Sequence, residues 1–456
     1  MNGQKYTPPY NLPVIENLPS FWDAWLPPEA KEKMLTPAEL AACWNRHKDI
    51  IRDMYAYYMY GPMPDTSGET LTYELDTPAI TEVILDDSYP CGGLPFRVRK
   101  INGTIHVSNE EGQGSFPIIL TLPEEITPGV GIPIYSEMSW MGGSSPNADY
   151  AAFRGYAAVS WKPGDIANDN QNRDGIFYRL YPYGWEPDTQ TGVLMAWSWG
   201  AGKILDALEQ GMGRELSIDS TLNILSGVSR YGKATAVAGA FDERITVAVP
   251  ACSGAGGMAS FRFPSQGITY DLSSVGYFQN GSSMYTMSQN EPLHVLLSPA
   301  ERHWFNDTVL KFPSAQQFPF DQHFLAALMA SENRHLFIVA GHNGEDWTNP
   351  PAMAYTYLAA REIYRRMGLE DHINIHIHEN NVEPSADFGI RRGPCPNHAV
   401  LAEDMVYLLD YCDYHLLGRK DISSDLSDLK TCAFFEEVNW DSRFDPYKYL
   451  LQPQVP

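Results

Sequence analysis

The segment with the clearest structural pattern in the chain is Leu222-Asn-Ile-Leu-Ser-Gly-Val-Ser-Arg-Tyr-Gly-Lys-Ala-Thr-Ala-Val-Ala-Gly-Ala240. Its apolar start predicts a short buried strand, and the residues from Lys233 to Phe241 predict a helix rich in small side chains. A sharp turn with a serine at its centre joins the two. A strand, a tight turn and a helix in this order expose a serine hydroxyl and point the first helical amides toward it. The segment therefore predicts a nucleophile at Ser229.

The turn departs in one position from the pattern Gly-x-Ser-x-Gly that is common for such nucleophiles. It reads Gly227-Val-Ser229-Arg-Tyr-Gly232, so a tyrosine stands where the second glycine is expected. Two cations, Arg230 and Lys233, follow the serine, although positive charge at a helix N-terminus opposes the helix dipole. Cations in this unfavourable place indicate a substrate that carries or generates a carboxylate.

The rest of the chain predicts strands that alternate with helices. A helix is expected from the N-cap Thr36 to about Tyr60. The expected strands are 71–75, 80–85, 96–107, 116–122, 156–161, 222–225, 245–249, 336–340 and 373–377. The other expected helices are 191–208, 233–241, 353–367 and 400–417. This alternation implies an α/β protein of the α/β-hydrolase type, a three-layer α/β/α sandwich with a mainly parallel sheet.

One main domain is expected, spanning residues 36–420. Within it, the stretch of about 255–325 does not follow the alternating pattern. We expect it to be an insertion over the C-terminal edge of the sheet, where such folds bind ligands. Residues 1–35 are rich in proline and aperiodic, which predicts an N-terminal arm, and residues 421–456 are expected to form a C-terminal extension.

The composition argues against several classes of partner. Lys and Arg number 32 against 56 Asp and Glu, a net charge of −24 with no basic run, so we expect no nucleic acid and no anionic membrane as partner. No window approaches 18 uninterrupted apolar residues, and the first residues do not form a basic and then apolar leader. Six widely spaced cysteines, without a Cys-x-x-Cys pair, do not indicate a redox compartment.

The turn around Ser229 resembles that of the glucuronoyl esterases, carbohydrate esterase family 15, which has the pattern Gly-Cys-Ser-Arg-x-Gly-Lys. Here the same positions read Gly227-Val-Ser-Arg-Tyr-Gly-Lys233. The similarity runs from about residue 40 to 417. It includes the motifs Trp44-Asn-Arg-His47, Met59-Tyr-Gly-Pro-Met-Pro64, Ser253-Gly-Ala-Gly-Gly257, Trp304-Phe-Asn306, Phe318-Pro-Phe-Asp-Gln-His-Phe324 and Glu345-Asp-Trp347. By this resemblance the chain is identified as a bacterial-type member of the family.

The resemblance implies an activity and roles for several residues. Members of the family cleave the ester between 4-O-methylglucuronic acid on xylan and a lignin alcohol, without a metal or another cofactor. In this chain Arg230 would then help to hold the oxyanion, and Lys233 would bind hydroxyls of the glucuronoyl ring. Trp347 would lie beside the sugar, and Glu291 would contact its hydroxyls. A substrate of this kind, glucuronoxylan with its lignin-carbohydrate esters, implies a secreted, extracellular enzyme, which we expect to be a monomer.

The general base is expected beyond the last strand of this fold, after the nucleophile and the acid. His398 fits that order, because it lies in the loop Gly393-Pro-Cys-Pro-Asn-His398 just before the closing helix. The family pattern favours the same residue. His342 and His323 remain alternatives.

The base needs a carboxylate to set its tautomer and to stabilise the imidazolium. In the family this acid usually stands directly before the Ser-Gly-Ala-Gly-Gly motif, a position that is Cys252 here. The sequence Gly344-Glu-Asp-Trp347, after a predicted strand, offers two carboxylates instead. Some bacterial members place an acid two residues before the tryptophan, which favours Glu345, with Asp346 as the alternative acid.

Three other hypotheses stay open. An acetyl or feruloyl esterase on the same fold would have little use for the two cations beside the serine. A catalytically inactive, carbohydrate-binding relative is suggested by Cys252 in the place of the acid. A metal site would have to use His372, His376 and His378, but no set of cysteines or carboxylates completes a tetrahedral site with them, so we expect no metal.

Overall fold

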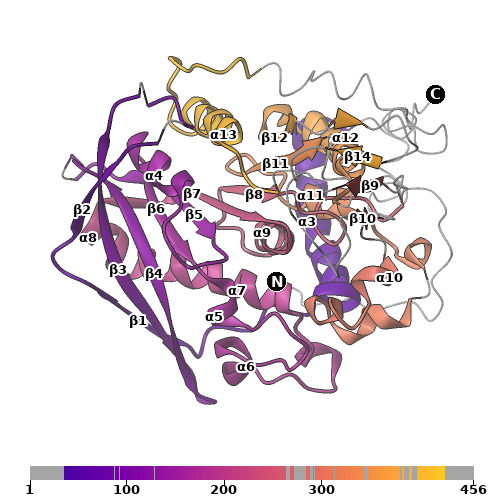
Figure 1. Ribbon diagram of the computed structural model, residues 1–456. Coiled ribbons are helices and arrows are strands. Elements are labelled where there is room, and N and C mark those ends of the chain that lie inside the picture. The colour runs from indigo at the N-terminus through magenta and orange to yellow at the C-terminus, as the bar shows by residue number, and fades with distance from the viewer. Residues whose placement is uncertain are drawn as a thin grey trace.

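The computed structural model describes residues 35–426 apart from 87, 92, 128, 263–267, 272–283, 288–290, 292, 313, 343–347, 380–382, 385–389 and 393–397. In this part of the chain, helices lie on both sides of a large twisted sheet (Figure 1). No helix of the described residues is long and apolar enough to cross a membrane. The predicted N-terminal arm and nearly all of the predicted C-terminal extension lie outside the described residues, so the domain boundaries stay predictions.

Antiparallel strands form the first part of the sheet. They are β1 (Thr70–Leu75), β2 (Ile80–Ile84), β3 (Phe96–Ser108) and β4 (Gln113–Pro123). The other three all pair with β3. Buried and more exposed residues alternate over much of β3, because only one face of this region packs against the protein. The four strands predicted here are confirmed, with ends shifted by up to about three residues.

The second part of the same sheet is parallel. Its strands are β5 (Ile132–Met138), β6 (Ala157–Trp161), β7 (Ile218–Val228), β8 (Val247–Ala251), β11 (His335–His342) and β12 (Ile373–Glu379). The order across the sheet is β1-β3-β4-β6-β5-β7-β8-β11-β12, and β4 joins β6 by antiparallel pairing. β6 and β8 are buried along their whole length, as strands covered on both faces must be. The mainly parallel sheet is confirmed, although β5 was not predicted.

The sheet divides the hydrophobic core into two layers, and helices cover each of its faces (Figure 1). The helices of the first layer are α7 (Val193–Ala207), α9 (Arg230–Phe241), α11 (Gln322–Ala327) and α12 (Pro350–Arg366), and those of the second are α4 (Pro146–Phe153) and α13 (Ala402–His415). Successive residues of β11 show the division: Phe337 and Val339 belong to the second layer, and Ile338 between them belongs to the first. The predicted three-layer sandwich is therefore confirmed.

The first described helix begins where the sequence predicts it. Thr36 and Glu39 form a reciprocal capping box at the start of α3 (Pro37–Tyr55), and a π-helical turn continues the helix to Tyr60. The buried hydroxyl of Tyr55 donates to the carbonyl of Asp321 at 2.8 Å. The helix is thus fixed to a segment far along the chain.

The irregular stretch around 255–325 contributes to a second, small sheet. Its strands are β9 (Ile268–Asp271) and β10 (Met284–Met287), joined by β13 (Glu383–Pro384) and β14 (Ile390–Arg392) in the order β10-β9-β14-β13. β9 and β14 pair in parallel although they are far apart in the chain. The stretch is therefore tied to the segment that follows β12, a link that the sequence did not predict.

Candidate active site

Ser229 occupies a strained turn between β7 and α9. Its φ of 62° and ψ of −127° lie in a region that costs a residue other than glycine about 1–3 kcal/mol. Its amide donates to the carbonyl of Ala251 at 2.9 Å, and its carbonyl accepts from the amide of Lys233 at 2.9 Å. The side chain stands at the N-terminus of α9, where the free amides and the helix dipole favour a developing negative charge. The structure thus gives Ser229 the strand-turn-helix geometry that its sequence predicts.

Two glycines make this turn possible. A Cβ at Gly227 would lie 2.6 Å from the carbonyl oxygen of Tyr231, and one at Gly232 would lie 2.4 Å from that of Ala251. Since both neighbours are backbone atoms, neither clash can be relieved by a side-chain rotation. Tyr231, which stands at the usual glycine position, is buried with its ring 4.5 Å from that of Trp140. The glycine is needed at position 232 because a side chain there would clash with the backbone of β8.

Arg230 is held on three sides beside the serine. Its guanidinium carbon lies 5.1 Å from the ring centre of Trp140 and 5.1 Å from that of Trp304, which are cation–π distances. Its Nη1 lies 2.5 Å from Oδ2 of Asp169, while 34% of the side chain remains exposed. The residue predicted to hold the oxyanion is therefore oriented and still accessible.

Asp169 links Arg230 to the two residues at the end of a short 3₁₀ turn. Its Oδ1 accepts a hydrogen bond from Nε1 of Trp304 at 2.7 Å and lies 2.7 Å from Nε2 of His303. Burial opposes its ionisation most strongly, but the bonds from His303 and Trp304 and the charge of Arg230 outweigh it and lower the pKa of Asp169 to about 2. Asp169 is therefore a permanently charged partner. The sequence did not single it out.

Lys233 is buried, with only 1% of its side chain exposed, and its charge is compensated locally. Its Nζ donates to the carbonyl of Ser253 at 2.7 Å and lies 2.5 Å from Oε2 of Glu291. The same Nζ lies 5.6 Å from the ring centre of Trp304, which also contacts Arg230. The structure therefore brings together Lys233 and Glu291, two residues that the resemblance assigns to sugar binding, and Lys233 shares the ring of Trp304 with Arg230.

A further titratable group near these residues is Glu301, which the sequence did not single out. Burial and the negative charge of Glu291 raise its pKa to about 7, against the opposite effect of Lys233 and Arg230. Its Oε2 is buried and has no hydrogen-bond partner among the described residues. This acceptor is therefore available to a ligand hydroxyl or to a water. Glu301 lies three residues before Trp304, the first residue of a motif shared with the family, and this position was the signal available in the sequence.

Ala399, the residue after His398, lies at the same corner of the molecule as the serine turn. His398 is half-buried just before α13, and its neighbour Ala399 accepts a weak hydrogen bond from Sγ of Cys252 at 3.9 Å. Cys252 directly follows Ala251, whose carbonyl binds the amide of Ser229. The candidate base and the candidate nucleophile are therefore both connected to the C-terminal end of β8.

The two alternative histidines differ in their position. His323 is only 2% exposed, within α11. His342 is the last residue of β11. The contact between Cys252 and Ala399 favours His398 as the base over His323, whereas His342 stays an alternative at the same edge of the sheet.

The segment predicted to supply the acid lies outside the described residues, so Glu345, Asp346 and Trp347 stay predictions. The strand that leads into this segment is β11. Its Val339 accepts a hydrogen bond from the amide of Cys252 at 2.8 Å. The C-terminal end of β11 is therefore at the same edge of the sheet as the end of β8, which is consistent with an acid supplied from beyond β11.

The histidines of the metal hypothesis make protein contacts instead. His376 and His378 of β12 bond through Nδ1 to the two oxygens of Asp404 in the first turn of α13, at 2.6 and 2.9 Å. The ring of His372 lies 3.1 Å from the carbonyl oxygen of Ser331. In the described part of the chain, no group of three or more His, Cys, Asp or Glu side chains is arranged to hold a metal ion.

Ser229 lies on a strained strand-to-helix turn at the C-terminal edge of the sheet in a three-layer α/β/α sandwich, and Ala399, next to His398, lies nearby. This arrangement is typical of the serine hydrolases with an α/β-hydrolase fold. A family model described as "Glucuronyl esterase, fungi" matches residues 105–368, more than half of the chain. The chain belongs to the glucuronoyl esterase family.

Individual relatives agree with this assignment. A multidomain esterase of Ruminococcus flavefaciens is 37% identical over 445 residues, which are 96% of this chain and 52% of the relative. A 4-O-methyl-glucuronoyl methylesterase of Hypocrea jecorina is 31% identical over 297 residues, 62% of this chain and 56% of the relative. Among solved structures, a carbohydrate esterase family 15 glucuronoyl esterase from Caldicellulosiruptor kristjansonii is 32% identical, with a TM-score of 0.67 and coverage of 96% of this chain and 98% of that one. The chain spans about half the length of the curated relatives it matches.

Proposed function

We propose that the protein is a serine esterase that hydrolyses esters of glucuronic acid. The observation that carries this proposal is the pair of cations beside Ser229: Arg230 and Lys233 both lie against the ring of Trp304. An esterase for a neutral acyl group has no use for two cations at this place. Hydrolysis of a uronic acid ester, in contrast, releases a carboxylate, and the uronic acid presents hydroxyls to Lys233. The names of the relatives support the same substrate class.

The proposed reaction is acyl transfer through the serine. His398 takes the proton of Ser229, whose Oγ attacks the carbonyl carbon of the ester. The oxyanion is held by Arg230 and by the amides at the start of α9, which are in place before the charge develops. His398 then protonates the departing alcohol, and a water activated by the same histidine releases glucuronate from the acyl-enzyme. Glu345 would orient His398, with Asp346 as the alternative acid.

The sugar ring is proposed to lie beside Trp347. Lys233 donates to ring hydroxyls while Glu291 compensates its charge and accepts from a hydroxyl. The buried Oε2 of Glu301, which has no hydrogen-bond partner among the described residues, would accept another. A carboxylate that binds a substrate hydroxyl also selects against substrates that lack it, because the acceptor is then left unpaired.

The same proposal includes the natural substrate and the place where the enzyme acts. The natural ester would join 4-O-methylglucuronic acid on xylan to a lignin alcohol, and the enzyme would act outside the cell as a monomer. We propose no cofactor, no nucleic acid and no membrane as partner. The strongly negative charge of the chain supports the last two points.

The experiment that tests the proposal compares benzyl glucuronate with an aryl acetate as substrates. The wild type should prefer the glucuronate ester, and Ser229→Ala should abolish its hydrolysis. Full activity of Ser229→Ala would remove this serine from the mechanism. A preference for the acetate would identify an acetyl esterase instead, and no turnover of either ester would favour the inactive, carbohydrate-binding relative.

A further inference from the structure

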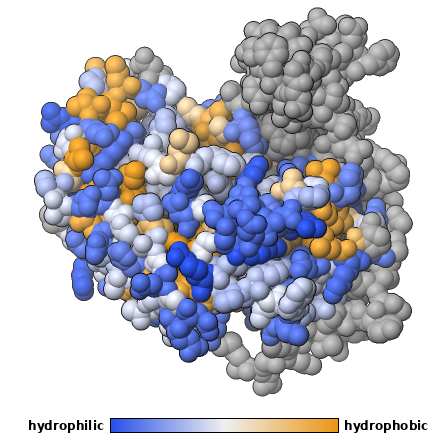
Figure 2. Space-filling model, turned by 60° about the horizontal axis from the view of Figure 1, so that its bottom comes forward, coloured by the Kyte–Doolittle hydropathy of each residue, from blue (hydrophilic) through white to orange (hydrophobic). Residues whose placement is uncertain are grey.

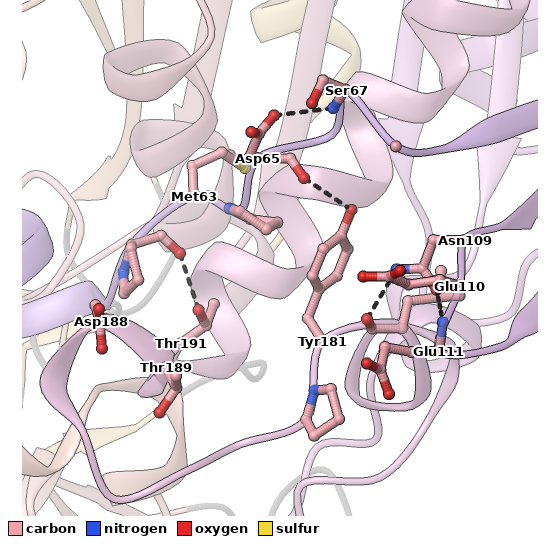
Figure 3. A pocket seen from close by; sticks show the side chains of 15 residues that line it. Met63, Asp65, Ser67, Asn109, Glu110, Glu111, Tyr181, Asp188, Thr189 and Thr191 are labelled. Carbon is pink, nitrogen blue, oxygen red and sulfur yellow. Dashed lines mark hydrogen bonds between the residues drawn. The ribbon is translucent and has the colours of Figure 1, made fainter.

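A cavity, which we call the Tyr181 groove, opens beside the tip of the β3–β4 hairpin. Its volume is about 630 Å³, within the range of small-molecule sites. Three segments line it: the chain that leads into β1, the hairpin turn, and the loop after α6 (Ile176–Leu180). In Figure 3, Tyr181 stands between the turn with Asn109 and Glu111 on one side and Asp188 on the other.

The walls of the Tyr181 groove are fixed by hydrogen bonds. The hydroxyl of Tyr181 donates to the carboxylate of Glu69 at 2.5 Å, and Nε1 of Trp199 donates to the same oxygen at 2.8 Å. Asn109 donates to the carbonyl of Leu180 at 2.9 Å and so joins the hairpin turn to the loop. A cavity that is already rigid loses little conformational entropy when a ligand binds.

The charge of the groove selects the class of ligand. Its polar lining includes the carboxylates of Asp65, Glu110, Glu111 and Asp188, and no Lys, Arg or His is among the described residues that line it. The amide of Ser67 donates to Asp65 and lowers the pKa of that carboxyl. Such a site repels uronates and phosphates but accepts hydrogen bonds from neutral hydroxyls. This is the opposite of the cationic site around Arg230.

An exposed aromatic ring lies on the same loop. Trp185 is 95% exposed, in the loop whose Tyr181 and Asp188 line the groove. The side chain of Gln190 donates to the carbonyl of Trp185 at 3.0 Å and holds the loop. The flat apolar face of an exposed indole suits the C–H face of a pyranose. The part of the surface that includes α6, at the bottom of Figure 1, is turned forward in Figure 2, where much of the described surface is hydrophilic.

One backbone segment connects the groove with the residues around Arg230. Thr191 lines the groove and accepts a hydrogen bond at its carbonyl from Tyr178 at 2.9 Å. A Cβ on the next residue, Gly192, would lie 2.4 Å from the carbonyl oxygen of Trp304. The ring of that tryptophan lies against Arg230. The segment that forms one wall of the groove therefore packs against the residue whose ring lies beside Arg230.

We infer that the Tyr181 groove, with Trp185, is a subsite for neutral pyranose residues of the xylan main chain, separate from the site of the glucuronoyl group. The inference rests on the proposed function for its choice of polymer. The division of labour follows from charge: the cationic site takes the uronic acid, and the acidic groove takes the uncharged sugars next to it.

The experiment measures binding of unsubstituted xylohexaose by calorimetry, with Ser229→Ala as the parent protein. We expect millimolar or tighter binding, weakened about tenfold or more by Trp185→Ala and by the double substitution Glu111→Gln and Asp188→Asn. The matched control is Glu125→Gln, an exposed carboxylate beyond the other end of β4, which should bind as the parent does. Equal binding by all variants, or none by the parent, would overturn the inference.

Two further measurements separate this inference from its alternatives. Calcium is titrated in parallel; a calcium site that these carboxamide substitutions abolish, without xylohexaose binding, would show a cation site and overturn the sugar subsite. Hydrolysis of benzyl glucuronate by the protein with Ser229 intact tests the proposed function by itself. If that ester is hydrolysed but xylohexaose does not bind, only the subsite fails.

Discussion

Nη1 of Arg230 lies 2.5 Å from Oδ2 of Asp169, so the cation beside the candidate nucleophile is anchored by a residue 61 positions earlier in the chain. The other oxygen of Asp169 binds Nε1 of Trp304, and the ring of Trp304 lies against the same guanidinium. Asp169 therefore fixes both the cation and one of its two aromatic neighbours. A donor held in place beforehand needs no reorganisation when an oxyanion forms.

Asp169→Asn should lower the turnover of glucuronate esters without unfolding the protein. The amide keeps the shape of the side chain but loses the charge that orients Arg230. We expect kcat for benzyl glucuronate to fall by about 10- to 100-fold with KM changed by less than about threefold, because the oxyanion exists only near the transition state. Asp174→Asn, an exposed residue of the same loop, is the control and should match the wild type. An equal loss in both variants, or a loss with a matching fall in Tm, would contradict the positioning role.

Gly232→Ala should disrupt the turn that presents Ser229. Its Cβ would lie 2.4 Å from the backbone oxygen of Ala251, and moving that oxygen would shift the end of β8. We expect the free energy of unfolding to fall by about 2–4 kcal/mol, measured by chemical denaturation. Gly143→Ala, where nothing lies within 4 Å of the new Cβ, should change it by less than about 0.5 kcal/mol. Similar stability of the two variants would show that the turn can relax around a larger residue.

The features that the sequence predicted well depend on neighbouring residues. The turn at Ser229 is encoded within a few positions by two glycines and by the small residues that follow. The start of α3 is encoded by Thr36 and Glu39, whose capping box needs no distant partner. Buried strands such as β8 are apolar along their whole length and were recognised for that reason.

The features that the sequence missed depend on contacts between distant segments. Asp169 acquires its role only because the loop before α6 meets Arg230 and Trp304. Glu301 acquires its raised pKa from burial and from the charge of Glu291, neither of which a local pattern reveals. The pairing of β9 with β14 likewise joins short strands separated by more than a hundred residues.

The acid of the triad can be identified by a pair of alanine variants. If Glu345 orients His398, Glu345→Ala should lower kcat by about 10³- to 10⁴-fold. Without the carboxylate, the histidine is not held in the required tautomer and its imidazolium form is not stabilised. Asp346→Ala, its neighbour and matched control, should then stay within about tenfold of the wild type. The reverse result would assign the role to Asp346. Activity near that of the wild type in both variants would exclude both residues.

Glu301 should make product binding depend on pH near neutrality. Its pKa of about 7 means that the carboxyl is largely neutral at pH 6 and largely charged at pH 8. Glucuronate is an anion throughout this range, so ionised Glu301 repels it and the inhibition constant of glucuronate should rise with pH. We expect an increase of about 3- to 10-fold between pH 6 and pH 8. Glu301→Gln should remove this increase, whereas the surface control Glu125→Gln should retain it. An unchanged pH dependence in Glu301→Gln would assign the titration to another group.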